Sequence, residues 1–326
     1  MGAGRDVLKA GLARLLRRPH VSKATVALLE GVGADALAAR VDRLRPRDGL
    51  EEITLPPGPD PVSPPSFRMH GLAGRDMVVR SIRNGGWGGF EAPLPSVVVA
   101  LVRARPTTVL DVGANTGLYS LIAVTAHLEA RAVAYEPVPP IGALLAANVA
   151  ANAQGARVVV RSCAITDRTG PVQLHLPPPQ LDGTVESSAS LESDFKEIVE
   201  QVVTVEGMTL DHAWAAEGRP QVDLVKIDVE GAEHRVLAGS GELVRTCRPL
   251  LTVEVLPTKS HLDAIEAFRA HHRYVDVILT PTAAVLNRSR LAPDARAPNH
   301  LLVPEERVDE TVQTLCSVPE LEVTRP

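Results

Sequence analysis

The chain has 326 residues, a formal net charge of −5, 45% hydrophobic residues and 22% charged residues. This composition is typical of a globular protein that buries one large α/β core and carries an appendage. The negative charge argues against a nucleic-acid partner, which would need a basic face. Three widely spaced cysteines without a C-x-x-C motif argue against structural zinc and favour a cytoplasmic location. No uncharged apolar stretch reaches the roughly 18 residues of a membrane span.

The N-terminal part differs in composition from the rest. Leucine and valine recur at helical spacing within residues 1–50, and LPPGPDPVSPP at residues 55–65 holds six prolines. This proline density excludes a helix or a central strand. We therefore expect a helical extension with a stiff linker (1–65), a main domain (66–310) and a C-terminal tail (311–326).

At the start of the main domain, a hairpin is expected with strands at Phe67–His70 and Met77–Ile82. A glycine-rich loop with Trp87 and Phe90 and a helix at Pro93–Arg103 follow.

The segment VLDVGANTG at residues 109–117 is the most informative part of the chain. It predicts a buried strand with Asp111 at its end, a tight turn through Gly113, Asn115 and Gly117, and then a helix at 118–126. The spacing departs from the G-x-G-x-x-G of dinucleotide sites, and a carboxylate there would repel a pyrophosphate. It would attract a cationic ligand, such as the sulfonium and ammonium of S-adenosylmethionine.

Three further strands end in carboxylates. Glu136 follows a short strand and can accept hydrogen bonds from both ribose hydroxyls of such a nucleoside ligand. Asp228 and Glu230 follow the strand Val222–Ile227, and Glu254 ends a fourth strand. Because strands and helices alternate, we expect a parallel sheet whose carboxyl ends face one ligand crevice.

Strands at Tyr274–Leu279 and His300–Val303 complete the sheet. Residues 171–176 and 201–205 are expected to pair as an extra hairpin, with residues 177–193 as a loop.

Together, DVGANTGLYS, AYEPVPPIGALLAANVAAN, VDLVKIDVEGAEHRVLAG and TVEV resemble the FkbM family of S-adenosylmethionine-dependent methyltransferases. WGGFEAP and NHLLVP are similar to the family's outer blocks, so that the resemblance covers about residues 75–305. It implies an α/β fold of class I methyltransferase type, with a Rossmann-like seven-stranded sheet and helices on both faces. It also implies methyl transfer to a hydroxyl of a small molecule, often a sugar or a natural product.

The motifs predict ten site residues and suggest lesser roles for His234 and Lys226. Asp228 is interpreted as a cofactor anchor, Glu230 as the first choice for the general base, and Glu254 as a group that orients the acceptor. His234 is a weaker base candidate, and Lys226 is expected to form an ion pair. The predicted cofactor-binding residues are Phe90, Glu91, Asp111, Gly113, Asn115, Gly117 and Glu136.

Several alternatives remain open. Asp228, Glu230 and Glu254 could also hold Mg²⁺, although a metal is not favoured. A nicotinamide-dependent oxidoreductase is disfavoured by the glycine spacing. An N-methyltransferase, or a catalytically silent domain that binds a partner through residues 1–65, stays possible. The oligomeric state is not predicted.

Overall fold

A computed structural model describes residues 49–56, 65–105, 108–178, 189–193, 195, 199–256 and 261–325. The helices expected before residue 49 lie outside the described residues, as do most of the proline-rich linker and residues 179–188 of the predicted loop.

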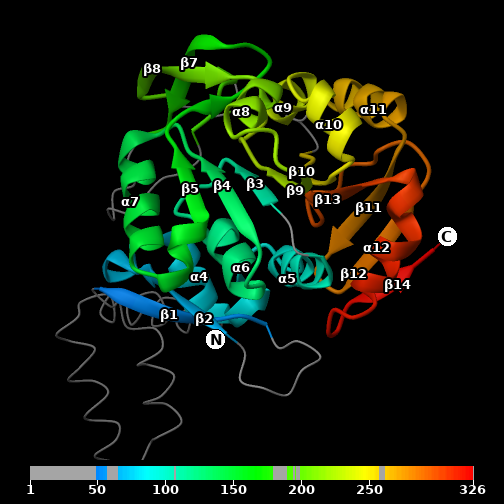
Figure 1. Cartoon of the computed structure of the whole chain (residues 1–326), viewed down its shortest axis with the longest axis horizontal. Coiled ribbons are helices and arrows are strands. Elements are labelled where there is room, and N and C mark those ends of the chain that lie inside the picture. The colour runs from blue at the N-terminus through cyan, green and yellow to red at the C-terminus, as the bar shows by residue number, and fades with distance from the viewer. Residues whose placement is uncertain are drawn as a thin grey trace, which may run out of the picture.

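A nine-stranded mixed sheet forms the centre of the molecule (Figure 1). Its strand order is β14-β12-β11-β13-β10-β9-β3-β4-β5. The five strands from β10 to β5 are parallel, whereas β13 is antiparallel to both of its neighbours. The bounds are β3 Thr108–Val112, β4 Arg131–Tyr135, β5 Val158–Arg161, β9 Val222–Ile227, β10 Leu250–Glu254, β11 Tyr274–Thr280, β12 Ala283–Asn287, β13 Asn299–Pro304 and β14 Glu322–Thr324.

This order confirms the Rossmann-like fold. The chain goes outward from β3 through β4 to β5 and then returns to the other side of β3 through β9 and β10, so that the strand order reverses between β3 and β9. Ligands of open α/β sheets bind at such a switch point, beyond the carboxyl ends of the strands. Two strands exceed the expected seven: β12 forms a hairpin with β11, and β14 pairs with β12.

Helices cover both faces of the sheet (Figure 1). Neighbouring strand residues point to opposite faces. On β3, Val109 belongs to a core that includes residues of α4, α5, α6 and α12, and Leu110 belongs to a core that includes residues of α8 to α11. The bounds are α4 Met77–Gly85, α5 Leu94–Ala104, α6 Leu118–Ala126, α7 Pro139–Ala150, α8 Leu210–Ala216, α9 Glu233–Ala238, α10 Gly241–Cys247, α11 Leu262–His271 and α12 Val308–Leu315. Short 3₁₀ helices are η1 Leu72–Gly74, η2 Gly86–Gly89, η3 Ala153–Arg157 and η4 Glu305–Arg307.

The expected strand at Met77–Ile82 is wrong, because this segment is α4. Asp76 caps the helix by accepting a hydrogen bond from the Val79 backbone N–H at 2.9 Å. Val78, Val79 and Ile82 are buried on one helical face. The predicted first strand exists as β2 (Ser66–His70), but it pairs in antiparallel fashion with β1 (Leu50–Thr54).

A small three-stranded sheet lies beyond the carboxyl ends of the central strands (Figure 1). It contains β6 (Ala164–Ile165), β7 (Gly170–Leu176) and β8 (Gln201–Met208), and the antiparallel pairing of β7 with β8 confirms the expected extra hairpin. At the C-terminus, the segment separated above as a tail contributes part of α12 and β14 to the main fold. In the part of the chain that the structure describes, no helix is both long and apolar enough to cross a bilayer.

Candidate active site

The glycine loop after β3 runs tightly against the end of β9. Gly113 has a φ of +75°, and a Cβ atom there would lie 1.8 Å from the backbone oxygen of Asp228. Gly117 has a φ of +96°, and a Cβ atom there would lie 2.4 Å from the Leu145 side chain. Only glycine fits such positions without strain. The two glycines therefore let the loop pack tightly against the end of β9 and against Leu145 of α7.

A pocket that is open to solvent at its mouth lies at the switch point between β3 and β9. The glycine loop, the ends of β4 and β9, the segment before α5 and the small sheet with its loop all contribute to its wall. Seven of the ten predicted site residues line it: Phe90, Glu91, Gly113, Asn115, Glu136, Asp228 and Glu230. The other three, Asp111, Gly117 and Glu254, lie next to the lining residues.

Glu136 presents a buried carboxylate to this pocket. Its Oε2 accepts a hydrogen bond from the Asn115 backbone N–H at 2.9 Å, and its Oε1 accepts one from the Val138 N–H at 2.9 Å. Each carboxylate oxygen has a second lone pair, so both oxygens can accept a further hydrogen bond. Burial raises the pKa of Glu136 to about 7, and the two backbone donors offset only part of this effect.

Asp111 lies beneath the glycine loop and is fully buried. Its Oδ2 accepts hydrogen bonds from the backbone N–H and the hydroxyl of Ser120, at 2.9 and 2.7 Å. Asp111 therefore ties the end of β3 to the first turns of α6, and it does not reach the pocket surface.

Lys226 is a buried cation at the base of the pocket. Its Nζ lies 3.0 Å from Asp228 Oδ2 and donates to the Gly113 backbone oxygen at 3.0 Å. Desolvation lowers the pKa of Lys226, but the charges of Asp228, Asp111 and Glu91 outweigh it and raise the pKa above its ordinary value. The expected ion pair is thus confirmed, and this ammonium group offsets part of the negative charge around it.

A second group of carboxylates lies beside Asp228. Oxygens of Asp228, Glu233 and Glu254 lie within 4.8 Å of one another. Burial, and then the charges of Asp228, Glu230 and Glu233, raise the pKa of Glu254 well above its ordinary value. Glu233 Oε1 accepts hydrogen bonds from the Val229 and Gly231 backbone N–H groups, and burial raises the pKa of Glu233 to about 7.

The segment before α5 adds one aromatic and one acidic side chain. Phe90 lines the pocket, whereas Trp87 packs against the core and donates its indole N–H to the Thr54 oxygen at 2.9 Å. Phe90 also packs against the core, so that of these two aromatic side chains only Phe90 lines the pocket as well. Glu91 accepts a hydrogen bond from the Tyr119 hydroxyl at 2.6 Å, and burial raises the pKa of its carboxyl.

Sequence reasoning missed Tyr119, Glu233 and Leu174 at the site. Glu91 and Tyr119 are 28 positions apart, so that no local pattern connects them. Glu233 had a detectable signal, since it is an acidic residue in the first turn of α9, directly after the Asp228–Glu230 turn. Ala189 and Leu191 of the predicted 177–193 loop also line the pocket.

The sequence of the chain is similar to those of known methyltransferases. Residues 111–275, about half of the chain, match a family profile described as the FkbM methyltransferase domain. The chain is 28% identical over 160 residues to the methyltransferase sdnD of Sordaria araneosa, covering 41% of this chain and 60% of that protein. It is 26% identical over 203 residues to the 2-O-methyltransferase NoeI of Sinorhizobium fredii, covering 55% and 82%. It is 31% identical over 169 residues to the 31-O-demethyl-FK506 methyltransferase FkbM of Streptomyces tacrolimicus, covering 42% and 61%. The chain thus spans about three fifths of the length of two of these relatives.

Solved structures with a similar course of the chain include a methyltransferase FkbM of Methylobacillus flagellatus KT. It is 14% identical, with a TM-score of 0.41, and the match covers 60% of this chain and 43% of that one. An O-methyltransferase of Bacillus cereus in complex with SAH is 12% identical, with a TM-score of 0.38, covering 65% and 80%.

Proposed function

The chain belongs to the FkbM family of methyltransferases, and we propose that it transfers the methyl group of S-adenosylmethionine to a hydroxyl of a small molecule. S-Adenosylhomocysteine is then the second product. The methyl carbon forms a bond to the acceptor oxygen, the carbon–sulfur bond breaks, and its electron pair stays on sulfur. The acceptor proton passes to a base on the enzyme.

One observation carries the choice of cofactor: the pocket at the switch point is lined by the carboxylates of Glu91, Glu136, Asp228 and Glu230, and Lys226 supplies a cation at its base. Such a pocket favours a ligand with a sulfonium and an ammonium group. It disfavours a pyrophosphate, which would lie against several negative charges. The nicotinamide alternative is therefore weaker on electrostatic grounds as well as on glycine spacing.

The hydroxyl acceptor is supported by the names of two relatives, a 2-O-methyltransferase and a 31-O-demethyl-FK506 methyltransferase. We assign cofactor binding to the glycine loop and to Glu136. Gly113 and Asn115 bring their backbone to the ligand, and Glu136 accepts the ribose hydroxyls. Asp111 and Gly117 shape the loop from beneath, and Phe90 and Glu91 cover the ligand from the side.

Three carboxylates have distinct assignments at the reacting end. Asp228 faces the cationic part of the cofactor and is oriented by Lys226. Burial, and then its acidic neighbours, raise the pKa of Glu254 well above its ordinary value, and Glu254 is assigned to orienting the acceptor. Glu230 lines the pocket at a left-handed turn and is assigned as the general base.

Mg²⁺ is not part of this proposal. The buried ammonium of Lys226, 3.0 Å from Asp228 Oδ2, competes with a divalent ion at the same carboxylate. We therefore expect methyl transfer to continue in the presence of a chelator.

Isothermal titration with S-adenosylmethionine, S-adenosylhomocysteine, NAD and NADP tests the cofactor. We expect the protein to bind S-adenosylmethionine and S-adenosylhomocysteine but not NAD or NADP. A folded protein that binds neither S-adenosylmethionine nor S-adenosylhomocysteine would overturn the proposal and favour a catalytically silent domain. A panel of sugars, hydroxylated natural products and matching amines then tests the acceptor. Methylation of amines alone would favour the N-methyltransferase.

The variant Glu136→Gln is expected to weaken S-adenosylmethionine binding by about 10- to 100-fold. It removes the charge from the acceptor of the ribose hydroxyls, and hydrogen bonds to charged groups contribute about 1.5–3 kcal/mol each. Titration calorimetry measures the change. The exposed Glu129→Gln is the matched control and should bind as the wild type does. Equal affinities of both variants would remove Glu136 from the site.

Cofactor affinity is expected to rise about tenfold between pH 6 and pH 8. The pKa of Glu136 is raised to about 7, so that its carboxyl is largely protonated at pH 6 and ionised at pH 8. Ionisation of Glu136 in the buried pocket destabilises the ligand-free protein. The stability that the protonated form of Glu136 retains is therefore lost as the pH rises through about 7. Titrations at pH 6, 7 and 8 measure the affinity. The amino group of the cofactor also titrates and can change the affinity with pH. In the Glu136→Gln variant, only the part of the pH dependence that is due to Glu136 should disappear.

A further inference from the structure

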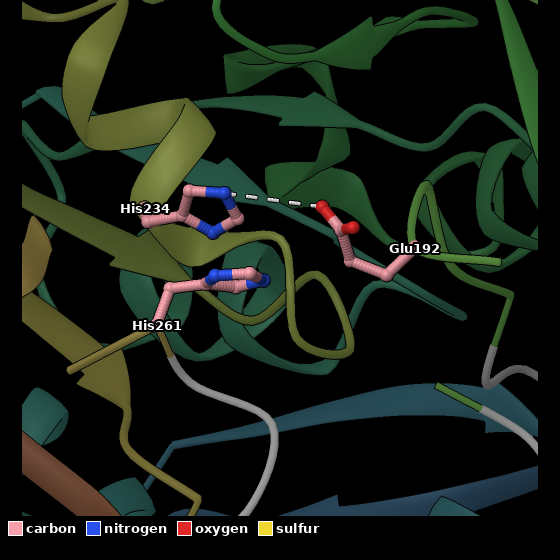
Figure 2. Close-up of side chains that lie close together, drawn as sticks. All are labelled: Glu192, His234 and His261. Carbon is pink, nitrogen blue, oxygen red and sulfur yellow. Dashed lines mark ion pairs between the residues drawn. The ribbon is translucent and has the colours of Figure 1, made fainter. Parts of the chain in front are cut away.

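Two histidines and one glutamate meet outside the pocket (Figure 2). Glu192 belongs to the loop 189–193, His234 to α9, and His261 lies directly before α11. One donor atom from each of the three lies within 4.8 Å of the other two. The Nε2 atom of His234 lies 3.9 Å from Oε1 of Glu192, and the two imidazole rings have centroids 3.9 Å apart at an angle of 36°.

Hydrogen bonds on both sides hold the glutamate in place. Arg235 Nε donates to Glu192 Oε1 at 2.7 Å, and the Glu192 backbone N–H donates to the Ser190 hydroxyl oxygen at 3.0 Å. Ser190 in turn donates its hydroxyl to the backbone oxygen of Glu230 at 2.6 Å. Because a carboxylate has four lone-pair sites, the pairing with Arg235 leaves Glu192 able to bind a second cation.

The histidine in α9 is suited to bind a metal as a neutral imidazole. His234 keeps 18% of its side chain exposed. An ordinary imidazole is largely neutral at neutral pH, and the neutral ring is the form that binds a metal ion.

We propose that Glu192, His234 and His261 form a site for a divalent transition-metal ion of the zinc type. Two imidazoles and one carboxylate, with a fourth position open to water, are a ligand set of zinc and of similar ions, whereas Mg²⁺ and Ca²⁺ prefer oxygen ligands. Tetrahedral zinc with ligand bonds of about 2.0–2.1 Å needs donor atoms about 3.3 Å apart. The Nε2 atom of His234 and Oε1 of Glu192, 3.9 Å apart, are close to this separation. A donor atom of His261 lies within 4.8 Å of both residues, so that its side chain must reorient for all three to bind one ion.

The ion would act on the shape of the pocket. The loop 189–193 contributes Ala189 and Leu191 to the pocket wall, and α9 starts just beyond Glu230. A metal bound by all three residues joins this loop to the starts of α9 and α11. Its role is to hold the wall in place, and it takes no part in the transfer of the methyl group.

Zinc binding by the full-length, tag-free protein tests this site. The protein is treated with a chelator, dialysed and titrated with Zn²⁺ in the presence of excess Mg²⁺. We expect one ion per chain. The variants His234→Ala, His261→Ala and Glu192→Gln should each bind at least tenfold more weakly, while His271→Ala, a histidine outside the cluster, should bind as the wild type does. Visible absorption of Co²⁺ in the same site should show imidazole ligation and be lost in His234→Ala.

Three results would overturn the site. These are a wild type that binds no stoichiometric zinc, displacement of the ion by excess Mg²⁺, and unchanged binding in both histidine variants, which would locate the ion elsewhere. His261 is exposed, so that His261→Ala reports on ligation with little risk to folding. Circular dichroism of each variant verifies the fold. Titration with S-adenosylmethionine is independent of this result, because the cofactor assignment does not require the metal.

Discussion

Replacing Lys226 by methionine is expected to lower the free energy of unfolding by about 3–5 kcal/mol at pH 8. Lys226 is buried, pairs with Asp228 at 3.0 Å and lies close to Asp111 and Glu91. Removing one partner of a buried ion pair leaves an uncompensated charge, and losses of this size follow. Chemical denaturation followed by circular dichroism measures the difference.

The loss should be smaller at pH 5.5 than at pH 8. Burial raises the pKa of Asp111 and of Glu91, so that these carboxyls can take up protons at the lower pH once the ammonium is gone. Arg131→Met, which removes an exposed cation at the start of β4, is the control and should change stability by less than about 0.5 kcal/mol.

A double variant separates the charge effect from the loss of packing. Lys226→Met combined with Asp228→Asn removes both members of the pair, and it should recover part of the stability lost in the single variant. A single-variant loss below about 1 kcal/mol, or a loss equal at both pH values, would show that Lys226 does not compensate these carboxylates.

The carboxylates of the pocket could be predicted because their signal is local. Glu136, Asp228 and Glu230 each follow a short apolar run, and the carboxyl ends of parallel strands meet at one edge of the sheet. Strand periodicity explains why Asp111 differs. It shares a face of β3 with Val109, which packs against the α5 and α6 side, so that its carboxylate meets Ser120 of α6.

The contacts that shape the remaining wall could not be read from local patterns. Tyr119 meets Glu91 across 28 positions, and Leu174 and Leu191 come from an insertion that folds back over the strand ends. The valines and isoleucine of Met77–Ile82 suit a strand as well as a helix, so that composition alone does not predict α4. The local signal for the helix is Asp76, which caps it.

The variant Glu230→Gln is expected to lower kcat by about 10²- to 10⁴-fold, far more than it weakens binding of the cofactor. A hydroxyl is a poor nucleophile, and a positioned base that accepts its proton contributes about this factor. The other two candidates are less suited to the task. Asp228 is held in an ion pair with Lys226, and Glu254 is already protonated near neutral pH because of its burial and its acidic neighbours.

The measurement is the rate of S-adenosylhomocysteine formation with the best hydroxyl acceptor of the panel, together with titration of S-adenosylmethionine. Glu206→Gln, an exposed glutamate of β8, is the matched control and should keep the wild-type rate. The amide introduced by Glu230→Gln preserves the size of the side chain, and Ser190 still binds the backbone oxygen at this position, so that a lower rate reports on proton transfer and not on a displaced turn. An unchanged kcat in Glu230→Gln would assign proton removal to another group, and Asp228→Asn would be the next variant to compare, since its carboxylate also lines the pocket.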